Sequence, residues 1–496
     1  MAIGHIFVLM LENRSFDHLL AYSGIAGLGG VDTSLTNPGA DGVPVPMSPV
    51  APDRSEVDPR HEFADVDWQL YGAPAGTGLR PIRLNGFANR GFPQAMQCAS
   101  PARVPVLTHL ARNFVVCDRW FSSMPGPTWP NRFFVHAGSS GGLTNSPSDL
   151  DSLGAMVWSK VSFSFEHGTL YQALTRAGRR WRIYHGDDFP QVCAIDSMPS
   201  VFVAEPGTFR PLDAFADDVG RGDAADFTFI EPDYGILSDF REGNSQHPCG
   251  SLAAGEALLA SVASAVMGSP LWQNSLLIVV YDEHGGFYDQ FPPPEGCVPP
   301  GDEPLNADKA KDPGLPFAFD RYGIRVPAVL VSPALKPGVS HEVYDHSSVI
   351  RTVFDVFGLP GQLTDRDGNA TSLEPLLGDA VQGAPQPLPV PAAPAVATPG
   401  ATVPAPPPPS LDGFVRIAAQ IHHALLTYQA AGGLPAPDLH AAIDPADDLN
   451  YLPNLPQTPN PDESRAYIAH VAGLIRAHRQ RQRQPGTRAP AAAARP

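Results

Sequence analysis

The chain has 496 residues, 43% of them hydrophobic, and a formal net charge of -18 at pH 7. A chain of this length can bury a large core and is expected to contain more than one structural unit. Its negative charge argues against general binding to nucleic acids, because a phosphate backbone is bound by clustered lysine and arginine. No apolar stretch is long enough to span a bilayer, so the sequence predicts no transmembrane segment.

The five cysteines are scattered along the chain and lack the spacing of metal ligands, so they predict no disulfide framework. The first apolar segment begins at His5, which leaves no room for the charged and apolar regions of an export signal. The sequence as written therefore predicts a cytoplasmic protein. A secreted or periplasmic location requires either that a signal was removed or that export uses a route without one.

A buried strand is expected over residues 5–11, an apolar run that includes β-branched side chains. Polar residues follow it at once, at the end of a strand where ligands gather in open α/β sheets. Glu12 and Asn13 offer oxygen ligands for a hard divalent cation, and Arg14 offers a fork for a phosphate or a carboxylate. The alternative interpretation is an ordinary helix start with Asn13 or Ser15 as its cap.

A second buried strand is predicted over residues 275–281, and it ends in Asp282, Glu283 and His284. Acidic residues after a strand also occur at ordinary helix starts, so this segment alone decides little. Two strands that both end in adjacent oxygen ligands, however, fit one metal site built across neighbouring strand ends. The pair of segments therefore favours a shared metal site.

Thr128 is the candidate nucleophile. Prolines on both sides hold its backbone rigid before a helix that is predicted to begin near Asn131. A hydroxyl near a helix N-terminus meets exposed amide groups and the positive end of the helix dipole, which suits a nucleophile that will carry phosphate. Arg132 is expected to face that phosphate. The alternative is a proline-rich loop in which Thr128 only caps the helix.

Helix–strand units with polar strand ends repeat from residue 1 to about 380 and predict an α/β fold with a mainly parallel sheet covered by helices. This segment, 1–380, is interpreted as the catalytic domain. Residues 381–410 are rich in proline and alanine and predict an extended linker. Residues 411–496 form a helical C-terminal segment with two predicted helices, 411–431 and 464–484.

The first of these C-terminal helices has an apolar face that needs a surface to cover. The face consists of Phe414, Ile417, Ile421, Leu425 and Tyr428. In one interpretation it packs back onto the catalytic domain. In the other, the segment is a lid or lipid-docking arm that makes peripheral contact with a membrane, with the arginines between 476 and 483 meeting anionic head groups.

These segments together give the chain a resemblance to the phosphoesterase family of bacterial phospholipases C and acid phosphatases. That family includes the plant non-specific phospholipases C and belongs to the alkaline phosphatase superfamily. The matching segments span roughly the first three-quarters of the chain and occur in the family's order. They are residues 12–18, 127–132, 247–248, 282–289 and 345–347.

The resemblance implies an α/β/α sandwich of the alkaline phosphatase type, with one divalent metal ion and a phosphothreonine intermediate on Thr128. The implied metal ligands are Glu12, Asn13, Asp282, Glu283 and Thr128. The implied phosphate contacts are Asn13, Arg132, His61 and His247, and the histidines with catalytic roles are His61, His247 and His284. A lone histidine is more often structural, so His61 draws its role from the resemblance. Oxygen ligands suit calcium, magnesium or manganese, and zinc is a further candidate for the metal.

The resemblance implies a small-molecule or phospholipid phosphoester as substrate. A threonine at position 128 favours a phosphodiesterase of the phospholipase C type, and an acid phosphatase on the same scaffold is the alternative. A catalytically silent binding protein is disfavoured by the complete set of ligands. Two features depart from the family: its members are usually exported, and the C-terminal segment does not match the β modules of the secreted haemolytic members.

Overall fold

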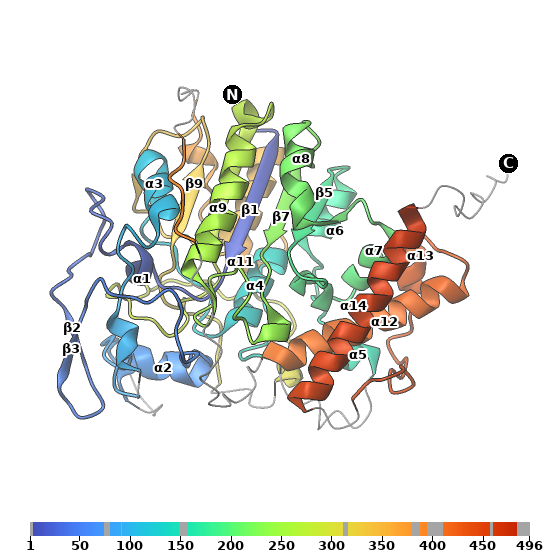
Figure 1. Cartoon of the computed structure of the whole chain (residues 1–496), viewed down its shortest axis with the longest axis horizontal. Coiled ribbons are helices and arrows are strands. Elements are labelled where there is room, and N and C mark those ends of the chain that lie inside the picture. Colours follow the sequence, from blue (N-terminus) through green and yellow to red (C-terminus); the bar gives the residue numbers. More distant parts are fainter. Residues whose placement is uncertain are drawn as a thin grey trace.

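An eight-stranded sheet forms the centre of the protein (Figure 1). The computed structural model describes residues 3–73, 80–90, 92–147, 157–310, 316–378, 387–393, 410–456 and 460–483. In spatial order the strands are β10 (Gly338–Ser340), β4 (Val115–Cys117), β9 (Ala328–Val331), β8 (Ser275–Tyr281), β1 (His5–Leu11), β7 (Phe227–Glu231), β5 (Trp181–His185) and β6 (Phe209–Pro211). A separate hairpin joins β2 (Thr36–Pro38) to β3 (Pro44–Pro46).

The sheet is parallel except for β9, which runs antiparallel to both β8 and β4. β1 lies between β7 and β8 and is parallel to both. Its register with β8 pairs His5 with Ser275 and Leu11 with Tyr281. Because both strands end at the same level, the residues that follow them meet at one edge of the sheet.

Helices cover both faces of the sheet. Phe7 of β1 packs edge-on against Phe215 of α8 (Phe215–Gly220), with ring centroids 6.0 Å apart. Phe229 of β7 pairs in register with Val8, which points to the opposite face from Phe7, and it packs against His136 of α4 (Thr128–Ala137). The predicted three-layer α/β/α architecture with a mainly parallel sheet is confirmed.

The remaining helices extend these layers. α9 (Leu252–Met267) packs between α8 and α3 (Pro105–Asn113), while α6 (Leu170–Arg176) and α10 (Ser347–Phe357) pack with α4. The others are α1 (Phe16–Leu20), α2 (Phe63–Tyr71), α5 (Trp158–Val161), α7 (Met198–Ala204), α11 (Asp365–Asn369), α12 (Ser410–Ala430), α13 (Ala436–Ala441) and α14 (Pro461–Arg483). None of the helices in the described part of the chain is long and apolar enough to cross a bilayer.

The C-terminal helices pack onto the rest of the molecule. Figure 1 shows α12 and α14 together at one side, beside α5 and α7. Four of the five predicted apolar positions of α12 are buried, and Tyr428 is partly buried. The Phe414 ring lies edge-on to Trp129, at 5.6 Å, and a Cβ on Gly413 would overlap the same indole. Most of the predicted linker, 381–410, falls outside the described residues.

Two of the arginines proposed for lipid docking contact the α/β part instead. Arg476 forms an ion pair with Asp188 at 2.6 Å. Arg479 lies over the ring of Phe202, 4.4 Å from its centroid. Because these contacts hold α14 against the segments that precede it, they favour the packing interpretation over a free docking arm.

Replacing Phe414 with alanine is expected to lower the free energy of unfolding by about 3 kcal/mol, since it removes a buried aromatic ring from the contact between α12 and α4. Chemical unfolding of the full chain measures the change. Val43→Ala is the matched control, because Val43 is exposed and its substitution should cost little. An effect of Phe414→Ala no larger than that of the control would contradict the packing of α12 on α4.

Candidate active site

The residues that follow β1 and β8 lie together at the carboxyl edge of the sheet. Glu12, Asn13, Asp282 and Glu283 are all buried. The backbone N–H of Asn13 donates to Asp282 Oδ1 at 3.0 Å. Asn13 has a φ of 55°, in the left-handed region that asparagine tolerates better than most residues. This turn ends β1 and brings the two predicted clusters into one site.

Thr128 joins this cluster as the first residue of α4. Its Oγ1 donates to Asn13 Oδ1 at 3.2 Å. The helix begins three residues earlier than predicted, and Asn131 lies inside it and donates to the Gly126 carbonyl at 3.0 Å. The loop before Thr128 is therefore tied to the helix, which fixes the hydroxyl at the strand ends. An N-terminal position on α4 also gives the hydroxyl the exposed amides of the first turn as neighbours.

Two of the carboxylates in the cluster, those of Glu12 and Glu283, each have an oxygen without a hydrogen-bond partner among the described residues. Glu12 Oε2 and Glu283 Oε1 are buried and make no hydrogen bond with the described residues. Burial raises the pKa of Glu12 to about 8, with Arg132 opposing the shift and Asp282 adding to it. Burial likewise raises the pKa of Glu283 to about 8. Unpaired buried carboxylate oxygens are costly, and a divalent cation would satisfy them. The residues therefore fit a hard cation held by oxygen ligands.

Arg132 contacts the ends of β1 and β8. Its Nε donates to Asp282 Oδ2 at 3.1 Å, and its Nη2 donates to the Met10 carbonyl at 3.3 Å. Because α4 starts at Thr128, Arg132 lies one turn further along the same face and points at the strand ends. The guanidinium thus positions and neutralises a candidate metal ligand. Its Nη1 is buried and has no hydrogen-bond partner among the described residues, so the predicted contact with a phosphate stays a prediction.

Arg14 also binds the protein itself. Its Nε donates to the Gln246 carbonyl at 2.7 Å, and its Nη2 donates to the His247 carbonyl at 3.1 Å. The predicted fork for a phosphate or carboxylate is therefore occupied by two backbone carbonyls. Through these bonds Arg14 fixes the loop that carries His247 beside the end of β1.

His61 lies directly at the oxygen cluster. Its Nε2 is 3.3 Å from Asn13 Nδ2 and 3.9 Å from Glu283 Oε1. Burial lowers the pKa of His61, but the carboxylates of Glu283 and Asp58 outweigh it and raise the pKa to about 9. The ring contacts the Pro59 carbonyl through Nδ1 at 2.5 Å, which leaves Nε2 directed at the cluster.

His247 is buried beside the oxygen cluster. Its ring stacks on Phe240, with centroids 4.1 Å apart, and it is 4% exposed. Its Nε2 is 3.6 Å from Asp58 Oδ1. Burial lowers the pKa of His247 to about 4, while Asp58 raises it. Both His61 and His247 therefore border Asp58, a residue that sequence reasoning did not single out.

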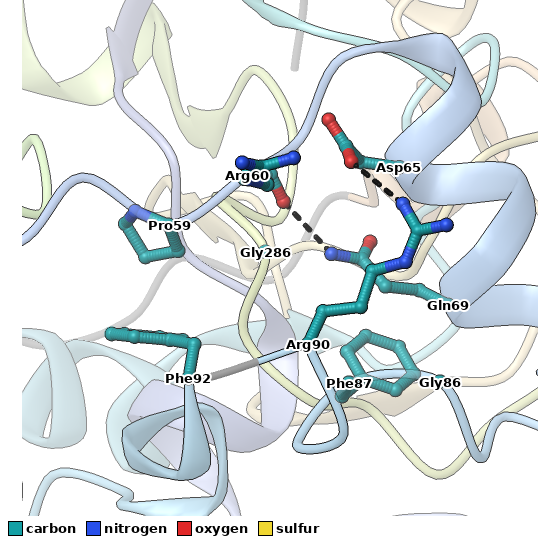
Figure 2. A pocket seen from close by; sticks show the side chains of 9 residues that line it. All are labelled: Pro59, Arg60, Asp65, Gln69, Gly86, Phe87, Arg90, Phe92 and Gly286. Atoms are coloured by element: carbon teal, nitrogen blue, oxygen red, sulfur yellow. Dashed lines mark hydrogen bonds and ion pairs between the residues drawn. The ribbon is translucent and has the colours of Figure 1, made fainter. Parts of the chain in front are cut away.

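The His284 ring lies next to the carboxylate of Glu283. Its Nδ1 is 3.3 Å from Glu283 Oε2. The Gln69 amide nitrogen donates to the Arg60 carbonyl at 2.8 Å, so the Gln69 oxygen accepts from His284 Nε2 at 2.7 Å. Figure 2 shows Gln69 between Arg60 and Arg90, in the wall of a small pocket beside Gly286. The segment before His61 is thereby linked to a candidate metal ligand.

Gly286 permits the close approach seen in Figure 2. Its φ is 74°, and a Cβ would lie 2.8 Å from both the Arg60 carbonyl oxygen and Pro59 Cβ. A side chain would push the 59–61 segment, and His61 with it, away from the cluster.

Gln69 and His346 are supporting residues that the sequence did not reveal. His346 Nε2 lies 2.5 Å from the Asp282 carbonyl oxygen. Gln69 carried no signal, because one amide on an amphipathic helix resembles any solvent-facing residue. His346 falls within the segment 345–347 that contributed to the resemblance, which assigned it no role.

Replacing Gln69 with leucine is expected to weaken metal binding about 10- to 100-fold, because His284 loses the acceptor that orients it toward Glu283. Metal titration of the purified variant, followed by calorimetry, measures the change. Gln94→Leu is the matched control, since Gln94 is exposed. Equal affinities for the two variants would contradict the supporting role of Gln69.

At the carboxyl edge of the sheet a hydroxyl at a helix N-terminus faces buried oxygen ligands, an arrangement that suits the hydrolysis of phosphoesters. Residues 3–360 match the model of the Phosphoesterase family. The chain belongs to this family.

Several known proteins are similar to this chain. The non-specific phospholipase C3 of Arabidopsis thaliana is 32% identical over 414 residues, which cover 75% of this chain and 73% of the relative. Phospholipase C B of Mycobacterium tuberculosis is 25% identical over 417 residues, covering 72% of this chain and 74% of the relative. A solved protein in the alkaline phosphatase superfamily from Vibrio parahaemolyticus matches with a TM-score of 0.35 and 11% identity, over 75% of this chain and 71% of that chain.

Proposed function

We propose that the protein is a metal-dependent phosphodiesterase of the phospholipase C type, acting through a phosphothreonine on Thr128. The observation that carries this proposal is the Thr128 hydroxyl, 3.2 Å from Asn13 Oδ1, among buried carboxylates with unpaired oxygens. The names of the relatives, non-specific phospholipase C and phospholipase C B, support the substrate class.

The ligand set for the cation would be Glu12, Asn13, Asp282, Glu283 and Thr128. A bound cation would lower the pKa of the Thr128 hydroxyl, whose proton passes to solvent, and would neutralise part of the phosphate charge. Thr128 Oγ1 then attacks phosphorus, and the bond from phosphorus to the leaving alcohol breaks. The amides of the first turn of α4 stabilise the charge on the equatorial oxygens.

His247 is the candidate proton donor to the leaving alcohol. In the neutral ring the Cys249 amide donates to Nδ1 at 3.3 Å, which places the proton on Nε2; the protonated ring that acts as the acid gives up this long contact. Burial favours the neutral ring, but Asp58 and an incoming phosphate both favour the protonated form. His61 faces Asn13 and Glu283 and is assigned to contact a phosphate oxygen. Water then attacks the phosphothreonine, and Oγ1 of Thr128 is released.

A phospholipid substrate also requires contact with a lipid surface. Among the described residues, three of the exposed large apolar side chains, Val43, Val50 and Val57, lie in the stretch just before Asp58 and His61. We assign peripheral membrane contact to this stretch. Val50→Asp should then slow turnover on vesicles and leave turnover of soluble esters unchanged; equal rates on vesicles would exclude the assignment.

A substrate panel with added metal ions tests the activity. Phosphatidylcholine vesicles and p-nitrophenylphosphorylcholine are diesters, whereas p-nitrophenyl phosphate is a monoester. The proposal expects kcat/KM for the diesters to exceed that for the monoester. The reverse order would favour an acid phosphatase on the same scaffold. Absence of turnover on every ester in the presence of calcium, magnesium, manganese or zinc would favour a binding protein.

A further inference from the structure

Asp58, His247 and Cys249 bring three different donor atoms together beside the oxygen cluster. One nitrogen, oxygen or sulfur atom from each side chain lies within 4.8 Å of the other two. Asp58 Oδ1 is buried and has no hydrogen-bond partner in the described chain. His247 Nε2 is 3.6 Å away from it, which is too long for a hydrogen bond. This leaves an unpaired carboxylate oxygen directed toward an imidazole and a thiol.

The two segments that carry these residues are fixed relative to each other. The Ser55 amide donates to the Pro248 carbonyl at 2.7 Å, which ties the loop before Asp58 to the loop of His247 and Cys249. A second bond joins the same two segments: Ser251 Oγ donates to Asp53 Oδ2 at 2.8 Å. The three donors are therefore preorganised, so a ligand that bridges them need not order either loop.

We propose that Asp58, His247 and Cys249 form a second metal site that binds Zn²⁺ or another thiophilic divalent cation. An imidazole nitrogen, a carboxylate oxygen and a thiolate sulfur are the ligands that zinc accepts, with water in the fourth position. The neighbouring cluster of Glu12, Asn13, Asp282 and Glu283 offers oxygen alone and suits a harder cation. The two sites thus differ in the metal that they select.

Binding of zinc would release the thiol proton of Cys249 and move the ring proton of His247 from one nitrogen to the other. The Cys249 Sγ–H bond breaks and its proton passes to solvent as the bond from sulfur to zinc forms. His247 binds through Nε2, so its proton moves by way of solvent to Nδ1. The contact of Nδ1 with the Cys249 amide, which is long at 3.3 Å, is given up in exchange for the bond to zinc.

Zinc at this site would inhibit the enzyme, because it occupies Nε2 of His247, the atom assigned to protonate the leaving alcohol. This consequence rests on the proposed function, whereas the binding itself does not. Cys249 takes no part in the proposed chemistry, so its substitution separates the two claims.

Cobalt provides a spectroscopic test of binding. The full-length protein is saturated with Mg²⁺ to occupy the oxygen cluster and is then titrated with Co²⁺. The wild type should develop a thiolate-to-cobalt charge-transfer band at one equivalent, and Cys249→Ser should not. Cys297→Ser is the matched control, since Cys297 is buried elsewhere in the fold, and should keep the band. Absence of the band from the wild type, or its persistence in Cys249→Ser, would overturn the site.

Inhibition is measured separately, with a diester that has a poor leaving group and with Mg²⁺ in excess. Zn²⁺ should inhibit the wild type, and Cys249→Ser should need at least about tenfold more zinc for the same inhibition. Equal inhibition of both proteins would overturn the inhibitory role. If the wild type hydrolyses no ester, the proposed function fails, but the cobalt band still decides whether the site exists.

Discussion

Replacing Thr128 with alanine is expected to lower kcat by more than about 10⁴-fold, because the variant lacks the oxygen that would form the covalent bond to phosphorus. Among the described residues, no other hydroxyl forms a hydrogen bond with Asn13 and could replace that of Thr128. Thermal stability should change little, since the side chain contributes one 3.2 Å hydrogen bond at the helix N-terminus, and the four remaining candidate ligands should still hold metal in a large part of the protein.

Thr128→Ser is the matched control, since it keeps the hydroxyl and should retain measurable turnover. Steady-state kinetics on p-nitrophenylphosphorylcholine compare the two variants. Turnover by Thr128→Ala near that of the wild type would exclude Thr128 as the nucleophile.

Replacing Asp282 with alanine is expected to abolish metal binding and destabilise the fold together. Both Asp282 oxygens are engaged: Oδ1 accepts from the Asn13 amide and Oδ2 from Arg132 Nε. Removing the carboxylate leaves Arg132 buried without its ion-pair partner, which costs about 3–5 kcal/mol. Elemental analysis and chemical unfolding measure the two losses.

Glu12→Gln separates metal binding from stability. Glu12 has an unpaired buried oxygen, so the neutral amide should cost little stability while removing a candidate ligand. It is expected to bind metal more weakly than the wild type and to unfold at a similar denaturant concentration. Full metal occupancy in both Glu12→Gln and Asp282→Ala would contradict a shared site.

The sequence was most informative where two buried strands end in polar residues. Apolar runs at 5–11 and 275–281 correctly predicted β1 and β8, and parallel sheets place such ends at one edge. That these two strands are direct neighbours, paired in register, depends on packing over more than 260 residues of intervening chain, which no local pattern encodes. The predicted strand at 327–332 exists as β9, but its antiparallel direction has no local signal either.

Side-chain orientation was the weakest part of the sequence-based account. The start of α4 lies three residues before the predicted one, and nothing in the sequence indicates that Arg132 donates to Asp282. The polar loop that carries His247 gives no sign that Phe240 covers its ring. Periodicity and composition describe single segments, whereas these contacts arise between segments that only the folded chain brings together.

Trapping the covalent intermediate tests the central claim most directly. Wild-type protein supplied with metal and a phosphodiester is quenched with acid during turnover, and its peptides are analysed by mass spectrometry. The account predicts one phosphoryl or phosphodiester adduct, located on Thr128, which appears on mixing and decays when substrate is exhausted. An adduct on another residue, or rapid turnover with no adduct on Thr128 at any time point, would contradict it.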